Sequence, residues 1–156
     1  GAYAVQGNVD RPGVWTAVFD RVPVETLLAT EVRDLGPVAL TGLSLADAFQ
    51  TDPTLPSAPE GTFHIVMGHS PNFSLGATEG DLLIAGHTHG GQVQLPLIGP
   101  LMTLSRVPRS WASGVTSLGD GRTLVVSRGV GMERGHAPQL RFLCRPEIVE
   151  IEVVPV

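Results

Sequence analysis

Short apolar runs alternate with glycine- and proline-rich breaks along the chain. Runs of this length, rich in Val, Ile and Leu, predict β-strands. We expect strands over residues 3–7, 24–32, 38–44, 63–67, 81–85, 92–97, 113–118, 122–127, 140–143 and 147–154. Short helices are expected over 14–21, 45–49 and 71–80. This strand-rich pattern places the chain in the α/β or α+β class.

Turn residues separate two pairs of these runs. Asp34-Leu35-Gly36-Pro37 follows the first run of one pair, which predicts either a hairpin or two separate strands of a sheet. Gly119-Asp120-Gly121 joins the second pair and gives the clearest hairpin signal of the chain. Segment 50–61 carries three prolines among polar residues and is expected to be a surface loop.

Histidines follow two neighbouring strands of the predicted sheet. The run 63–67 is followed by Gly68-His69, and the run 81–85 by Gly86-His87-Thr88-His89. Open α/β sheets build sites outside their strand ends, so these imidazoles are expected to share one site. Side chains at i and i+2 of a strand point to the same face, and His87 and His89 are therefore expected to project together from a strand end. The alternative is a pair of surface histidines in a turn.

Composition narrows the possible partners. With 156 residues, 42% of them apolar, the chain is expected to form a single domain over 1–156 with a real core. Its formal charge is -5 and all ten basic residues are arginine, so neither nucleic acid binding nor a polybasic membrane anchor is expected. No apolar run is long enough for a membrane segment. The single Cys144 is expected to be a buried structural thiol.

Three motifs together resemble the second half of the calcineurin-like metallophosphoesterases. They are Gly7-Asn8-x-Asp10, Gly68-His69 and the long run from Gly86 to Val93. The last motif is most similar to a bacterial branch in which it extends to Gly-His-Thr-His-Gly-Gly-Gln. The tail from Ser127 to Ile148 resembles the same branch. The match begins near residue 3 and covers the C-terminal half of such a domain.

The resemblance implies a fold and a site. The fold is a sandwich of two β-sheets flanked by helices, of which this chain is the C-terminal part. Asn8, His69 and His87 are implied as ligands of one metal ion, and His89 as a ligand of another. The metal is a divalent transition ion (Mn, Fe or Zn), for which imidazole is a suitable ligand, and the substrate is a phosphate ester.

Two departures from the family pattern limit what the resemblance implies about the metal site and about catalysis. The family's first two motifs, which supply carboxylate ligands, have no counterpart here, so we expect a partial domain. Val9 stands where the family has a histidine that contacts the phosphate, and no catalytic residue is assigned. Two divalent ions about 4 Å apart repel strongly, and imidazoles and an amide bring no negative charge to offset this. At most one ion is therefore expected for this chain alone.

Other polar residues have simpler interpretations. His64 lies within a predicted strand and is expected to be structural, whereas His136 is expected in a solvated loop. Asp10 is expected to accept backbone N–H groups of its loop, and Gln92 either reaches a substrate phosphate or begins a strand. Four arginines are exposed or receive an anionic substrate: Arg106, Arg109, Arg128 and Arg134.

Three functions are compatible with these observations. The first is a metal-dependent phosphoesterase domain that is incomplete as given. The second is a degenerate, non-catalytic relative with a metal-binding or interaction role, which Val9 favours. The third is a β-rich structural domain in which the histidine motifs are coincidental. A partial domain leaves unpaired strand edges, so self-association or binding of a complementing N-terminal half is expected.

Overall fold

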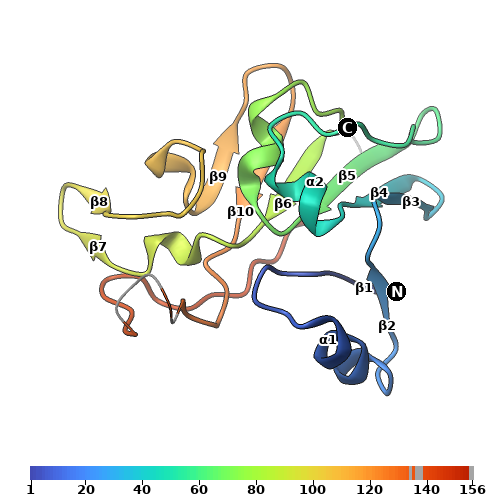
Figure 1. Ribbon diagram of the computed structural model, residues 1–156. Coiled ribbons are helices and arrows are strands. Elements are labelled where there is room, and N and C mark those ends of the chain that lie inside the picture. Colours follow the sequence, from blue (N-terminus) through green and yellow to red (C-terminus); the bar gives the residue numbers. More distant parts are fainter. Residues whose placement is uncertain (134, 136–138, 155–156) are drawn as a thin grey trace.

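A six-stranded mixed sheet forms the centre of the protein in the computed structural model, which describes residues 1–133, 135 and 139–154 (Figure 1). Its strand order is β3-β4-β5-β6-β10-β9. The bounds of its strands, in chain order, are β3 Glu31–Asp34, β4 Val38–Gly42, β5 Phe63–Gly68, β6 Leu82–Ala85, β9 Gly114–Ser117 and β10 Thr123–Val126. The strand-rich α/β class is confirmed.

The four central strands run parallel, and an antiparallel strand closes each edge. β5 and β6 are hydrogen-bonded neighbours in a register that pairs Gly68 with Ala85. The carboxyl ends of parallel strands meet at one edge of a sheet, so the segments that follow β5 and β6 begin side by side. The hairpins β3–β4 and β9–β10 lie where the turn residues predicted them.

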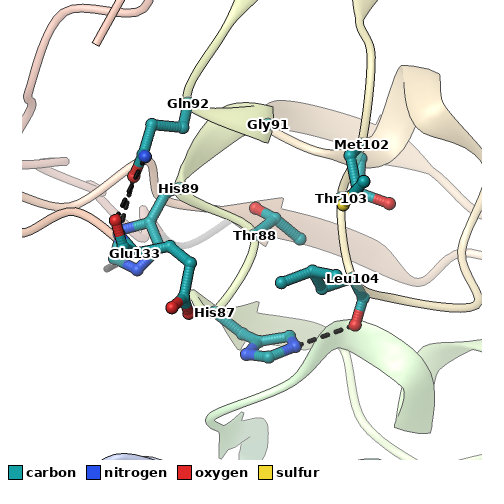
Figure 2. Close-up of a pocket in the computed structure, with 9 residues that line it drawn as sticks. All are labelled: His87, Thr88, His89, Gly91, Gln92, Met102, Thr103, Leu104 and Glu133. Atoms are coloured by element: carbon teal, nitrogen blue, oxygen red, sulfur yellow. Dashed lines mark hydrogen bonds between the residues drawn. The ribbon is translucent and has the colours of Figure 1, made fainter. Parts of the chain in front are cut away.

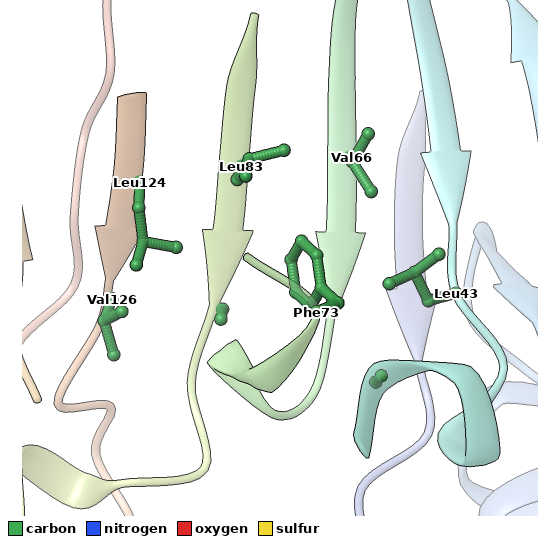
Figure 3. Packing of buried hydrophobic residues seen from close by; sticks show 8 residues of the cluster. Leu43, Val66, Phe73, Leu83, Leu124 and Val126 are labelled. Carbon is green, nitrogen blue, oxygen red and sulfur yellow. The ribbon is translucent and has the colours of Figure 1, made fainter. Parts of the chain in front are cut away.

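One face of this sheet carries the core. Leu43, Val66, Phe73, Leu83 and Leu124 are among its fully buried side chains (Figure 3). Two short helices pack over them: α2 (Leu45–Phe49) and the 3-10 helix η1 (Pro71–Leu75). A fully buried side chain of this size contributes roughly 1.5–3 kcal/mol through removal of apolar surface from water.

Side-chain caps fix where both of these helices begin. Ser44 precedes α2 and its hydroxyl accepts a hydrogen bond from the backbone N–H of Asp47. Ser70 does the same for η1 with the N–H of Asn72. The helix expected in 71–80 ends early, at Gly76, where a Cβ would lie 2.3 Å from the carbonyl oxygen of Thr51.

The N-terminal region forms a smaller layer beside the large sheet (Figure 1). β1 (Ala2–Val5) pairs in parallel with β2 (Val24–Leu27), and α1 (Pro12–Phe19) connects them. The expected single strand 24–32 is wrong, because the chain divides it between two sheets. Thr30 holds the intervening bend: its hydroxyl donates to the Asp47 carboxylate and accepts from the N–H of Ser44 at 3.0 Å.

The strands expected after residue 127 are also wrong. Within the described residues, 140–143 makes only an isolated bridge between Phe142 and Val93, and 147–154 has no strand assignment. A strand needs a hydrogen-bonded neighbour along its length. Segment 147–154 has no strand partner among the described residues, although the N–H of Glu147 bonds the carbonyl oxygen of Gly129 at 3.1 Å. The expected strand 92–97 shortens to β7 (Gln94–Leu95), which pairs with β8 (Gly99–Pro100). No described helix is long and apolar enough to cross a membrane.

Candidate metal centre

Three side chains meet beyond the carboxyl ends of β5 and β6. His69 and His87 each follow one of these strands, and the loop after β1 brings Asn8 to them. The Nε2 atom of His69 lies 2.7 Å from Oδ1 of Asn8 and 3.1 Å from Nδ1 of His87. Residues 61 and 18 positions from His69 along the sequence thus direct their polar atoms at one point.

A backbone carbonyl orients His87. Its Nε2 lies 3.0 Å from the carbonyl oxygen of Leu104 (Figure 2). A carbonyl oxygen only accepts, so Nε2 carries the proton of the neutral ring, and Nδ1 keeps its lone pair toward His69. An N–H bond from the second ring nitrogen to a carbonyl is the usual support of a metal-binding histidine. The ring edge also packs on Phe49, with 5.0 Å between ring centres.

These three atoms fit one divalent transition cation. Two imidazole nitrogens that each lie about 2.1 Å from one ion are separated by roughly 3.0–3.4 Å, and the nitrogens of His69 and His87 are 3.1 Å apart. Among the described residues no three His, Cys, Asp or Glu side chains are arranged to hold a metal ion. The amide oxygen of Asn8 is therefore needed as the third donor.

His89 lies in the same cavity but has different contacts. A cavity of about 810 Å³ is lined by all four predicted ligands, Asn8, His69, His87 and His89. The His89 ring accepts at Nδ1 a long hydrogen bond of 3.4 Å from the guanidinium of Arg141. The structure therefore brings three of the four predicted ligands into direct contact and places the fourth beside them.

The two histidines of the last motif do not project from a strand, so that expectation is wrong. β6 ends at Ala85, and both His87 (φ 65°) and His89 (φ 49°) have left-handed backbone conformations. The 3-10 helix η2 (His89–Gly91) then turns the chain. Gly90 is required in it: its φ is 62°, and a Cβ there would lie 2.6 Å from the Arg128 side chain.

Burial favours the neutral form of two of these imidazoles, those of His69 and His89. It is the main reason that the pKa of His69 falls to about 4, and the neighbouring His87 lowers it further, whereas Asp10 acts in the opposite direction. Burial also lowers the pKa of His89, with the positive charge of Arg141 as the second cause. Near neutral pH both rings are uncharged, which is the form that binds metal ions.

Comparison with known proteins identifies the family. The chain is 32% identical over 161 residues to an uncharacterized metallophosphoesterase, YkuE of Bacillus subtilis, which it matches over 95% of its own length. It is 33% identical over 172 residues to the phosphodiesterase YaeI of Escherichia coli, matched over 97% of the chain. The chain belongs to the metallophosphoesterase family. Neither a family model nor a solved structure matches it significantly.

The metallophosphoesterase relatives are much longer than this chain. The matched regions cover 54% of YkuE and 58% of YaeI. A further uncharacterized metallophosphoesterase, Cj0846 of Campylobacter jejuni, is 36% identical over 87 residues, which are 54% of this chain and 21% of that protein. The chain thus spans just over half the length of the first two relatives.

Sequence reasoning missed the negative charge of this cavity. Glu133 and Asp10 both line it together with the histidines. The expected loop role of Asp10 is confirmed, because its carboxylate accepts the N–H of Gly7 at 2.8 Å. No motif spacing identifies Glu133, because it reaches the cavity from the irregular segment after β10.

The contacts of His64, Cys144 and Gln92 test the roles expected for these three residues. His64 is structural as expected: it is buried in β5, 2.7 Å from the hydroxyl of Thr41. Cys144 is buried, as expected. Gln92 begins no strand, and its amide instead bonds the backbone of Glu133.

The arginines expected to be exposed or to receive an anion have different surroundings. Arg128 pairs with Glu147, whose carboxylate lies 2.8 Å from the Arg128 Nε atom. Arg106 and Arg109 are exposed. Arg134, like His136, lies outside the described residues.

Proposed function

We propose that the chain is a metal-dependent phosphoesterase domain that binds one divalent transition cation, Mn, Fe or Zn, through Asn8, His69 and His87. The observation that carries this proposal is the convergence of their three donor atoms, at separations of 2.7 and 3.1 Å. His89, in the same cavity, is proposed as a ligand of a second position, which this chain alone does not fill. Membership of the metallophosphoesterase family supports the choice of reaction.

Two features of the chain favour cation binding by these histidines. The Leu104 carbonyl holds the His87 ring so that Nδ1 presents a lone pair, and burial keeps His69 uncharged. A bound divalent cation supplies Lewis-acid polarisation of a phosphoryl oxygen and activation of water. Because one relative is named a phosphodiesterase, a phosphodiester is the substrate class to test first.

A non-catalytic role is the second candidate, and Val9 favours it. This side chain lines the cavity with 74% of its surface exposed. An aliphatic group can neither donate a proton to a leaving group nor bind a phosphate oxygen. In this alternative the domain keeps cation binding and lacks hydrolysis.

Residues 1–156 are further proposed to act as the second half of a two-sheet domain. Among the described residues the parallel pair β1–β2 forms a sheet of two strands, and such a pair is marginally stable alone. The segment 148–154 alternates apolar and acidic residues without a strand partner among the described residues. Added strands, from a complementing polypeptide or a second copy, would pair these edges. Sedimentation across a concentration series tests this, and a monomer throughout contradicts self-association.

Hydrolysis of bis-p-nitrophenyl phosphate with added Mn²⁺, measured together with metal content per chain, tests the proposed activity. We expect His87→Ala to lose both metal and activity. His64→Gln is the matched control, because it removes a histidine that is buried outside the cavity lining. Metal that is retained by His87→Ala contradicts the proposed ligands. Metal binding without activity in the unmodified chain favours the non-catalytic alternative.

A further inference from the structure

The carboxylate of Glu133 faces the histidines of the candidate metal centre. Glu133 lines the cavity that also contains His69, His87 and His89. It also lines a narrower cleft with His87 and His89. In Figure 2 its side chain lies beside His89 and its carboxylate points toward His87. A charged oxygen group thus shares the site with neutral imidazole donors.

A buried glutamine holds Glu133 in this place. The side chain of Gln92 is only 1% exposed. Its Oε1 accepts the backbone N–H of Glu133 at 2.6 Å, and its Nε2 donates to the backbone carbonyl of the same residue at 3.2 Å. These two bonds join positions 41 residues apart in the sequence. Burial of an amide is costly unless it is bonded, so here it fixes the backbone of Glu133 at the cavity.

Asp10, the other carboxylate of the cavity, acts on the site by raising the pKa of His69, against the larger effect of burial, and it also has a local role. It accepts the N–H of Gly7, three residues earlier, and closes its own turn. Glu133 also bonds a nearby backbone group, the N–H of Gly135 at 2.5 Å, through one oxygen. The two carboxylates differ in how their backbone is held. The buried side chain of Gln92 anchors the backbone of Glu133 beside the imidazoles.

We propose that Glu133, positioned by Gln92, supplies the negative charge that a divalent cation needs at this centre. The proposal rests on the proposed function, because it concerns the same cation. Asn8, His69 and His87 are all neutral donors, so they leave the charge of a divalent ion uncompensated. A carboxylate in the same cavity lowers the energy of the bound ion by Coulomb attraction. Sequence motifs assign this role to no residue of the chain.

Equilibrium dialysis of the full chain against Zn²⁺, with bound metal quantified, tests the proposal without an activity assay. Glu133→Gln keeps the shape of the side chain and removes its charge. We expect the dissociation constant for Zn²⁺ to rise about 10–100-fold, the range found for groups that support metal ligands. Glu133→Asp keeps the charge and should lose much less affinity. Glu60→Gln, at an exposed loop position, is the matched control and should bind as the unmodified chain does.

The outcomes separate this proposal from the proposed function. If Glu133→Gln binds Zn²⁺ normally while His87→Ala does not, Glu133 has no such role and the ligand set still stands. If Glu133→Gln and Glu60→Gln weaken binding equally, the effect is one of net charge and the proposal is wrong. If His87→Ala binds Zn²⁺ normally, the proposed ligands themselves are wrong. Circular dichroism of each variant verifies that it is folded.

Discussion

The ends of β5 and β6 and the segment after β10 both contribute residues to the cavity of the candidate metal centre, but they are held in different ways. His69 and His87 follow hydrogen-bonded parallel strands whose side chains form the core. Glu133 and Arg141 lie in irregular chain that is held by side-chain hydrogen bonds and by the isolated bridge between Phe142 and Val93. The large sheet therefore fixes His69 and His87, whereas Glu133 and Arg141 depend on a few hydrogen bonds. Substitutions in the core below the sheet should therefore change the stability of the fold, whereas substitutions in the segment after β10 should change mainly the charge around the site.

The largest difference should appear in stability. Phe73 is completely buried over the sheet, whereas Ile148 in the C-terminal segment is 90% exposed. We expect Phe73→Ala to lower the free energy of unfolding by about 3–5 kcal/mol, because it leaves a cavity in the core. Ile148→Ala should change it by less than about 0.5 kcal/mol. Urea unfolding measures both, and equal losses would show that the C-terminal segment belongs to the cooperative core.

The pH dependence of folding should identify the contribution of the strand ends. The pKa of His69 is about 4 in the folded chain, against an ordinary value of 6.5. The unfolded chain therefore takes up the proton first as pH falls, and the folded state loses stability between about pH 6.5 and 4. Above pH 6.5 this contribution is complete. Metal-free His69→Gln should show a flatter profile in that window, and identical slopes would exclude His69 as the titrating group.

A smaller effect should follow from loosening the segment after β10. Glu147 accepts the backbone N–H and the guanidinium of Arg128, both at 2.8 Å. We expect Glu147→Gln to cost about 0.5–1 kcal/mol, the usual range for a partly exposed ion pair. Thermal unfolding checks this, with the exposed Glu150→Gln as control. A loss as large as that of Phe73→Ala would place this segment in the core after all.

The sequence predicted the parts of the fold whose partners are local or follow a regular period. The strands β5 and β6, the hairpin β9–β10 and the helix α2 appear close to their expected positions. The same pattern failed at 24–32 and 147–154. A high β-propensity indicates that a segment can form a strand, but whether the strand pairs depends on the neighbouring strands that the fold provides. Segment 24–32 has neighbours in two sheets, and 147–154 has no strand partner among the described residues.

The residues of the candidate site that belong to sequence motifs were predictable, whereas their backbone conformation and Glu133 were not. The glycine-framed motifs led to Asn8, His69, His87 and His89, all of which line one cavity. Their backbone conformation was not predictable from an i, i+2 spacing, because His87 and His89 adopt positive φ values. Glu133 could not be found either, because a single glutamate carries no spacing signal and its position depends on a bond to Gln92.

The central claim is that Asn8, His69 and His87 bind one divalent cation, and NMR of the imidazole nitrogens during Zn²⁺ addition tests it most directly. We expect the resonances of His69 Nε2 and His87 Nδ1 to change together and to saturate at one ion per chain. His64, which bonds Thr41 in the core, should keep its resonances. If Zn²⁺ leaves the nitrogens of His69 and His87 unchanged, or if two ions bind tightly to each chain, the account of this centre is wrong.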